Sequence, residues 1–303
     1  MKIKEMEYVL FRQTLASEGL FLHIGPFIVK LQSSFALVAE SVYRLYADFI
    51  VEVKADFADF HVSVQSPKGI RRWFRPQCVF SFDGLLPFKP LPANHAFVFF
   101  EWGLNWCIAQ YAHQYLIIHS AVLEKNGKAV ILPGVPGAGK STLCAALSLN
   151  GWRLLSDEFA LFSLSEKHLT PIPRPVSLKN ESVDIIRNLK GETVFGPLVE
   201  NTHKGTIALM KPITDYVEAS QQTVKPAWVI LPEFKPGSTT ELTTLMKGKG
   251  FMEVKKNCFN YDVLGHRGFK SLGELIKQCD CYNFSYSNLD EALRTFDELA
   301  FEQ

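Results

Sequence analysis

Residues 134–141 read Gly-Val-Pro-Gly-Ala-Gly-Lys-Ser and complete the phosphate-binding pattern G-x-x-x-x-G-K-[ST]. Its glycines let the backbone turn with the N–H groups facing inward. Lys140 would place its charge on the β- and γ-phosphates, and Ser141 would offer a hydroxyl to Mg²⁺. A chance glycine-rich turn would lack the apolar strand expected before the loop and the helix expected after it, whose N-terminal dipole attracts anions. The loop therefore predicts nucleotide binding by Gly134, Val135, Pro136, Gly137, Ala138, Gly139, Lys140, Ser141 and Thr142.

Two adjacent acids, Asp157 and Glu158, end the next predicted strand, residues 153–156. Kinase chemistry needs a metal that neutralises the phosphates and a carboxylate that accepts the proton of the acceptor hydroxyl. One of these acids could hold Mg²⁺ while the other takes that proton. The alternative is a solvated strand end that happens to carry two acids.

His119 lies in the middle of a second apolar strand, residues 115–124. The Asn126-Gly127 pair is a strong hairpin signal, so this strand is expected beside the strand that enters the phosphate loop. By that geometry His119 could approach Asp157 and tune it or relay its proton. The alternative is an ordinary core histidine with satisfied hydrogen bonds.

Cations follow the acidic pair in the stretch 173–179. Arg174 or Lys179 could neutralise the charge that develops on a transferring phosphoryl group, and Arg174 is the favoured candidate. A solvated loop is the alternative. Residues 203–206, His-Lys-Gly-Thr, are a weaker candidate of the same kind.

The periodicity of the chain predicts the elements that must position these residues. Residues 1–92 are expected to form a small α+β domain, residues 93–114 a connecting aromatic helix, and residues 115–303 the nucleotide-binding domain. In the last third, helical spacing is expected near residues 241–249 and 272–278, with a strand at 282–286 and a closing helix.

Composition narrows the class of protein. The 303 residues are 47% hydrophobic and 21% charged, with a net charge of +1, so a globular chain without a nucleic-acid-binding or membrane surface is expected. Its apolar runs are too short to span a bilayer. The six cysteines match no zinc spacing, which indicates reduced thiols and a cytoplasmic location. The 24 phenylalanines indicate Phe-rich cores, with an exposed aromatic docking face as the alternative.

The order of a histidine, a hairpin, a phosphate loop, a short helix and an acidic pair resembles the HPr kinase/phosphorylase family. The residues that carry the resemblance are His119, the segment 134–142, Gly151, and the acids Asp157 and Glu158. The phrases Trp-Gly-Leu-Asn-Trp at 102–106 and Gly-Trp-Arg-Leu-Leu-Ser-Asp-Glu-Phe at 151–159 are most similar to the branch called HprK-related kinase A. The resemblance implies an α/β (α+β) fold with a compact P-loop kinase core and a mixed sheet, as in phosphoenolpyruvate carboxykinase.

The resemblance also implies roles for single residues. Asp157 would be the general base that activates a serine hydroxyl, His119 its partner, and Lys140 the ligand of the β- and γ-phosphates. Glu158 and Ser141 would lie around Mg²⁺. The second acid is Glu here, where HPr kinases carry Asp, and their glycine-rich segment after the acids is not visible.

Together these features predict an ATP- and Mg²⁺-dependent kinase with an unidentified hydroxyl acceptor, a serine of a protein or peptide or a serine-like small molecule. The alternative is a nucleotide-binding partner protein, or slow ATPase, that recruits a peptide or protein client without phosphorylating it. A GTPase is disfavoured because no guanine-reading Asn-Lys-x-Asp is evident. A homo-oligomer is left open by the sequence.

Overall fold

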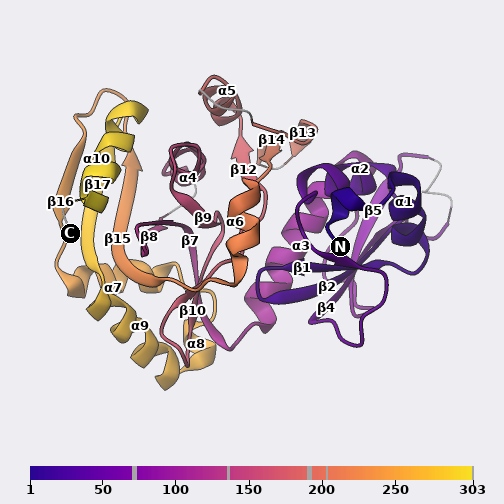
Figure 1. Ribbon diagram of the computed structural model, residues 1–303, viewed down its shortest axis with the longest axis horizontal. Coiled ribbons are helices and arrows are strands. Elements are labelled where there is room, and N and C mark those ends of the chain that lie inside the picture. Colours follow the sequence, from indigo (N-terminus) through magenta and orange to yellow (C-terminus); the bar gives the residue numbers. More distant parts are fainter. Residues whose placement is uncertain (70–73, 135–136, 190–192, 203, 302–303) are drawn as a thin grey trace.

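The computed structural model describes residues 1–69, 74–134, 137–189, 193–202 and 204–301. Helices are interspersed among runs of strands along the chain, and the strands form three sheets (Figure 1). The expected α/β class with a mixed sheet is confirmed. Among the described residues, no helix has both the length and the apolar character that a membrane crossing requires.

The largest sheet has the order β11-β10-β7-β8-β15-β17-β16, and β9 also pairs with β7. Its pairs β8–β15 and β15–β17 are parallel, whereas β7 pairs antiparallel with β8, β9 and β10. The strands are β7 (Tyr115–Lys125), β8 (Lys128–Pro133), β9 (Arg153–Ser156), β10 (Phe159–Ser163), β11 (Leu169–Thr170), β15 (Lys225–Phe234), β16 (Glu241–Thr244) and β17 (Asp280–Tyr286).

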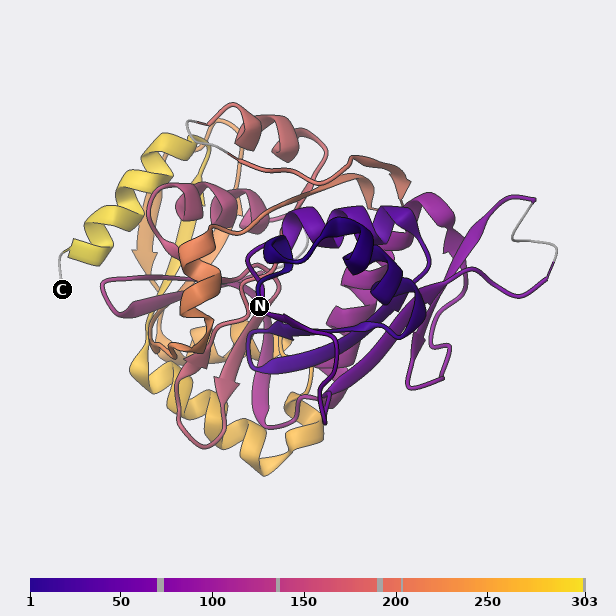
Figure 2. The same ribbon diagram turned by 45° about the vertical axis from the view of Figure 1, so that its right-hand side comes forward.

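Helices cover both faces of this sheet. Alternate residues of β8 point to opposite faces, as a strand requires. Val130 and Leu132 pack with α4 (Lys140–Leu149) and α10 (Leu289–Phe301). Ala129 and Ile131 pack on the other face with α7 (Lys247–Lys256), α8 (Tyr261–Leu264) and α9 (His266–Gln278). Figures 1 and 2 show α10 and the α7–α9 pair on opposite sides of the strands.

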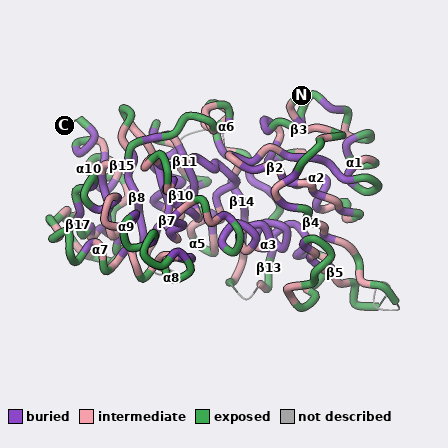
Figure 3. The backbone as a smooth tube through the Cα atoms, turned by 90° about the horizontal axis from the view of Figure 1, so that it is seen from below, coloured by how far each residue is buried: buried purple, intermediate pink, exposed green. Residues whose placement is uncertain are grey.

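The N-terminal part of the chain forms a second sheet with the order β3-β1-β2-β4-β5-β6. Its elements are η1 (Ile3–Glu5), α1 (Tyr8–Ser17), β1 (Leu20–Ile24), β2 (Phe27–Ser33), α2 (Ala36–Leu45), β3 (Val51–Glu52), β4 (Phe60–Gln65), β5 (Gln77–Phe82), β6 (Leu91–Pro92) and η3 (Ala93–His95). The helix α3 (Ala96–Tyr111) follows, and it is buried along most of its length (Figure 3). Gly103 of α3 packs so closely on Phe80 that an added Cβ would lie 2.1 Å from the ring.

A third, small sheet, of order β12-β14-β13, lies between these two parts (Figure 1). It consists of β12 (Val176–Lys179), β13 (Val199–Thr202) and β14 (Gly205–Met210), and α5 (Glu181–Arg187), α6 (Thr214–Glu218) and η4 (Ala219–Gln221) accompany it. One buried cluster joins the N-terminal sheet to Ile117, Phe159 and Ile207. Buried Asp48 adds a polar connection, because it pairs with Lys211 at 2.6 Å and with Lys4 at 2.8 Å and accepts a hydrogen bond from Thr214. The domain boundaries after residues 92 and 114 stay a prediction.

Most strands near the loop lie where the sequence predicts them, including the Asn126-Gly127 hairpin between β7 and β8. The helix expected near residues 241–249 is wrong in its first half. Residues Glu241–Thr244 form the edge strand β16, paired antiparallel with β17, and α7 begins only at Lys247. The Thr-rich segment has a high strand propensity, and the free edge of β17 provides its pairing partner.

Candidate functional site

A cavity of about 480 Å³ opens at the N-terminus of α4, beside the end of β8. It lies near the carboxyl ends of the parallel strands β8, β15 and β17, the edge at which open α/β sheets bind ligands. Residues from the phosphate loop, the acidic pair, β7 and the small sheet line it: His119, Gly137, Gly139, Lys140, Ser141, Thr142, Asp157, Glu158, Ser177, Lys179, Asn180, Ser182 and Lys204. Most of the residues singled out from the sequence therefore meet in one place.

The described part of the phosphate loop has the backbone that its glycines were expected to allow. Gly137 and Gly139 have φ of +91° and +85°, and Gly139 is the N-cap of α4. A Cβ on Gly139 would lie 2.6 Å from the Tyr286 hydroxyl, so a side chain there would be both strained and obstructed. Val135 and Pro136 lie outside the described residues.

Lys140 begins α4 and is only 7% exposed. Its Nζ donates a hydrogen bond to the Gly134 carbonyl across the loop. Burial lowers the pKa of Lys140, and the nearby charges of Asp157 and Glu158 oppose that shift. Burial deprives the ammonium of its interactions with water, and a bound phosphate would replace them with charge-assisted hydrogen bonds. The position of Lys140 therefore suits phosphate binding.

Asp157, between β9 and β10, is 6% exposed. Its Oδ2 accepts a hydrogen bond from the Ser177 N–H at 3.1 Å, whereas buried Oδ1 has no hydrogen-bond partner among the described residues. Burial and then the charge of Glu158 raise the pKa of Asp157 to about 7, although the Ser177 N–H, Ser141 and Lys179 favour the charged form. A carboxyl that titrates near neutral pH can accept a proton, and its unsatisfied oxygen calls for a ligand.

His119 lies beside Glu158 and does not form the expected pair with Asp157. Its Nδ1 is 3.6 Å from Glu158 Oε2 and 3.3 Å from the Glu158 carbonyl oxygen. Strand pairing explains the difference, since β7 pairs His119 with Phe159 while the Ser120 N–H donates to the Glu158 carbonyl. This pairing holds Glu158 next to the histidine, and Asp157 is held by Ser177 of β12 instead. Burial lowers the pKa of His119, which the charge of Glu158 partly counteracts.

Arg174 does not line the cavity. It is 6% exposed, its Nη1 lies 3.2 Å from Glu101 Oε2, and its Nη2 donates to Asn105 Oδ1. Both partners belong to α3, so this guanidinium is engaged in joining the N-terminal part of the chain to the segment before β12. Besides Lys140, the described lysines that line the cavity are Lys179, the alternative expected from the sequence, and Lys204 from the weaker stretch. His203 lies outside the described residues.

The sequence did not point to three further lining residues, Ser177, Asn180 and Ser182. Ser177 contributes its backbone N–H, which any residue other than proline would also provide, so its residue type gives no signal. Ser182 accepts a hydrogen bond from the Thr142 hydroxyl at 2.7 Å, which ties α5 to α4. Only the strand pairing of the small sheet brings these residues to the loop, so no local pattern could have found them.

The donor set suits Mg²⁺ that is shared with a nucleotide. The described residues include no group of three or more His, Cys, Asp and Glu side chains that could hold a metal alone. Mg²⁺ at phosphate sites usually takes one or two carboxylates, with phosphate oxygens and water completing the octahedron. The hydroxyl of Ser141 and the carboxylate of Glu158 belong to residues that line one cavity, and they fit that requirement.

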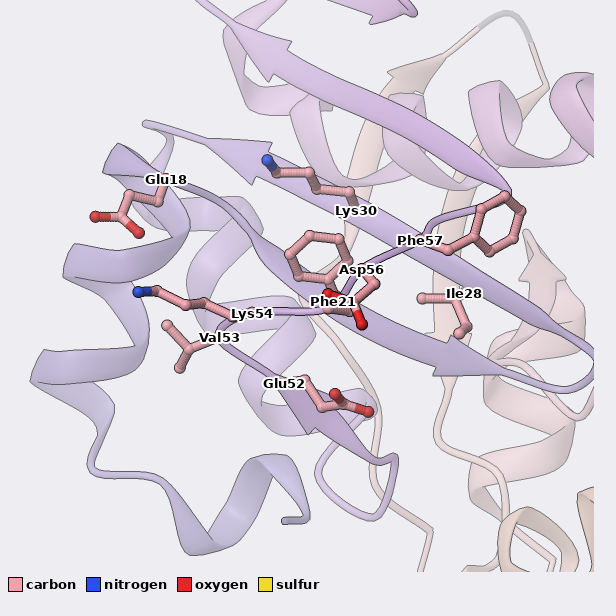
Figure 4. Close-up of a pocket in the computed structure, with 10 residues that line it drawn as sticks. Glu18, Phe21, Ile28, Lys30, Glu52, Val53, Lys54, Asp56 and Phe57 are labelled. Carbon is pink, nitrogen blue, oxygen red and sulfur yellow. The ribbon is translucent and has the colours of Figure 1, made fainter.

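A larger cavity, of about 680 Å³, lies far from this chemistry, on the N-terminal sheet (Figure 4). Phe21 and Lys30, which line it, come from β1 and β2, and Glu52 comes from β3. Lys30 lies over the Phe21 ring at 5.2 Å, and Glu52 pairs with His23 at 2.6 Å. It is lined by charged groups of both signs, and none of the residues predicted for catalysis is among its lining residues.

Comparisons with known proteins give little further information about the function of this site. No protein-family model and no curated protein matches the chain. Among solved structures, the Hpr(Ser) kinase/phosphatase from Coxiella burnetii aligns with 62% of this chain and 99% of its own, at 12% identity and a TM-score of 0.28. A TM-score of this size does not establish a shared fold, so the proposals below rest on the site itself.

Proposed function

We propose that this protein is an ATP- and Mg²⁺-dependent kinase that transfers the γ-phosphoryl group to a hydroxyl, that of a serine in a protein or peptide or of a serine-like small molecule. The observation that supports it is the cavity in which Lys140 and Ser141 of the phosphate loop face Asp157 and Glu158. Phosphoryl transfer needs little covalent chemistry from the protein, and this cavity supplies what it does need, positioning and charge.

The loop and α4 bind the phosphates in this proposal. Backbone N–H groups around Gly137 and Gly139 and the N-terminus of α4 favour an anion, and Lys140 reaches the β- and γ-phosphates. Ser141 and Glu158 would hold Mg²⁺, which when bound would neutralise charge on the transferring group. The 3.6 Å approach of His119 to Glu158 supports a positioning role for the histidine at that carboxylate.

Asp157 takes the proton of the acceptor hydroxyl. Its burial keeps the carboxyl near the pKa at which a base is effective at neutral pH, and the Ser177 N–H fixes one oxygen while the other is left to the acceptor. General-base catalysis typically contributes about 10²–10⁴ in rate, so that is the loss expected when Asp157 is replaced by Asn.

The test is transfer of label from γ-³²P-ATP with Mg²⁺ into lysate proteins and metabolites, with Asp157→Asn, Glu158→Gln and wild type compared at equal nucleotide binding. Asp157→Asn should lose the labelled acceptor at every Mg²⁺ concentration. Glu158→Gln should recover part of its activity as Mg²⁺ is raised, because it weakens a metal ligand rather than removing the base.

One result would decide against the kinase proposal, and another against the role of Asp157 in it. Nucleotide binding by all three proteins with no labelled acceptor would favour a nucleotide-binding partner protein that recruits a client. An acceptor labelled equally by wild type and Asp157→Asn would leave the kinase activity standing and remove Asp157 as its base.

A further inference from the structure

Two lysines of the small sheet line the cavity, although they lie far from the phosphate loop in the sequence. Lys179 ends β12, and Lys204 lies in the turn between β13 and β14. Neither ammonium forms an ion pair with a described carboxylate within 4.0 Å. The nucleotide phosphates already have Lys140 and the α4 N-terminus, so these two cations remain to be explained.

The positions of the two lysines are built by hydrogen bonds that do not involve their own ammonium groups. The Asn180 N–H donates to the Thr206 carbonyl at 2.9 Å, and the Thr206 N–H donates to Asn180 Oδ1 at 3.1 Å. In the turn, the Lys204 N–H donates to Thr202 Oγ1 at 3.0 Å. The end of β12 and the turn are thereby locked together, so both lysines face the same cavity.

Lys204 is also held from the side of α3. Its Nζ lies 5.0 Å from the centre of the Trp102 ring, a cation–π contact that orients the side chain. Partial burial and then the charge of Lys179 lower the pKa of Lys204, and the charge of Glu158 opposes that shift. The charge of Lys179 also lowers the pKa of Lys140, so the three lysines of this cavity act on one another through Lys179.

Two like charges in a partly desolvated cavity, neither of them in an ion pair with a described carboxylate, favour the binding of an anion there. Two ammonium groups match a dianion better than a single carboxylate, and the nearby Ser182 hydroxyl adds a neutral hydrogen-bonding group. We propose that Lys179 and Lys204 form an anion subsite, separate from the nucleotide site, that binds a phosphate monoester group carried by the acceptor. The acceptor class is then a phosphorylated compound with a free hydroxyl. This inference rests on the proposed kinase function.

The test uses the full chain saturated with Mg²⁺ and β,γ-imido-ATP, so that the γ-phosphate position is occupied, and ³²P-labelled inorganic phosphate as the probe in equilibrium dialysis. We expect one phosphate per chain, bound more tightly than ¹⁴C-acetate. Lys179→Gln and Lys204→Gln should each weaken phosphate binding at least about tenfold, the size of a lost charge-assisted hydrogen bond. Lys270→Gln, on the exposed side of α9, is the matched control and should change nothing.

Trp102→Leu is a second variant that leaves both charges in place, and it should weaken phosphate binding about threefold through lost orientation of Lys204. Nucleotide-saturated protein that binds no phosphate would overturn the inference, as would lysine variants that bind it normally. An equal loss of phosphate and of β,γ-imido-ATP would overturn it too, because the lysines would then serve the nucleotide. Wild type that fails to bind β,γ-imido-ATP would overturn the proposed function itself, a result distinct from the others.

Discussion

The burial of Asp157 predicts that this one carboxyl destabilises the folded chain at neutral and alkaline pH when no ligand is bound. Its pKa is raised, first by burial and then by Glu158, from 3.8 to about 7. Between those values the folded state holds the proton that the unfolded state has released, so the free energy of unfolding falls as pH rises. Replacement by the nearly isosteric Asn removes the titration and keeps an acceptor for the Ser177 N–H.

The size of the effect follows from the two pKa values. A difference of about 3 in pKa, at 1.36 kcal/mol for each, corresponds to about 4 kcal/mol once the pH is well above 7. About 3 kcal/mol of that falls between pH 5 and pH 8. Between pH 5 and pH 8 the free energy of unfolding of Asp157→Asn should therefore rise by about 3 kcal/mol relative to that of wild type.

The measurement is urea unfolding at pH 5, 6, 7 and 8 with EDTA present, followed by the fluorescence of the buried Trp152 and Trp228. Asp184→Asn is the control, because it makes the same Asp-to-Asn change at a side chain that is 78% exposed. If the gap between Asp157→Asn and wild type is the same at pH 5 and pH 8, Asp157 is not a raised-pKa carboxyl. The basis for its role as a base at neutral pH would then be lost.

Three further outcomes test the connections that hold the site in place. Burial alone would raise the pKa of Asp48, but hydrogen bonds from two lysines and a threonine lower it from 3.8 to about 2. The stabilisation that the Asp48 carboxylate gives the folded chain is therefore fully present above pH 3.8 and is lost as pH falls through about 2. Asp48→Asn should cost about 2 kcal/mol at pH 7 by urea unfolding, with the difference from wild type fading below pH 4. Arg174→Met should lower the free energy of unfolding by about 3–5 kcal/mol, because it leaves the buried carboxylate of Glu101 without its ion-pair partner. Adding Glu101→Leu should recover part of this loss. Equal stabilities of the single and the double variant would contradict this expectation. Gly103→Ala should lower stability by about 1–3 kcal/mol, since the new methyl group would overlap the Phe80 ring, and a thermal midpoint equal to wild type would show that α3 is free to move there.

The local signals were sufficient for much of the core around the site. A strand, a glycine-rich loop and a helix follow one another at residues 128–149, and their order and spacing predict both the conformation and the phosphate chemistry. The Asn126-Gly127 turn likewise predicts the β7–β8 hairpin, because few other dipeptides accept its backbone angles. These features are determined by residues that are close together in the sequence, so they can be predicted from the sequence alone.

Partners that come from distant segments could not be deduced in this way. Whether His119 meets Asp157 or Glu158 depends on how β7 pairs with β10, and one residue of register changes the answer. Arg174 reads as an exposed loop cation, yet Glu101 and Asn105 of α3 take its guanidinium into the interior. Residues 241–244 became a strand because β17 offered an unpaired edge.

The sequence by itself predicted a phosphate loop, determined which strand and helix flank the glycine-rich segment, and showed that two acids follow nearby. Only the tertiary structure decided which acid is buried, which one the histidine accompanies, and that Lys179 and Lys204 rather than Arg174 reach the cavity. The physical reason is that residue type fixes what a side chain can do, whereas burial and packing fix its charge state and partner. Those depend on contacts between segments that lie far apart in the chain.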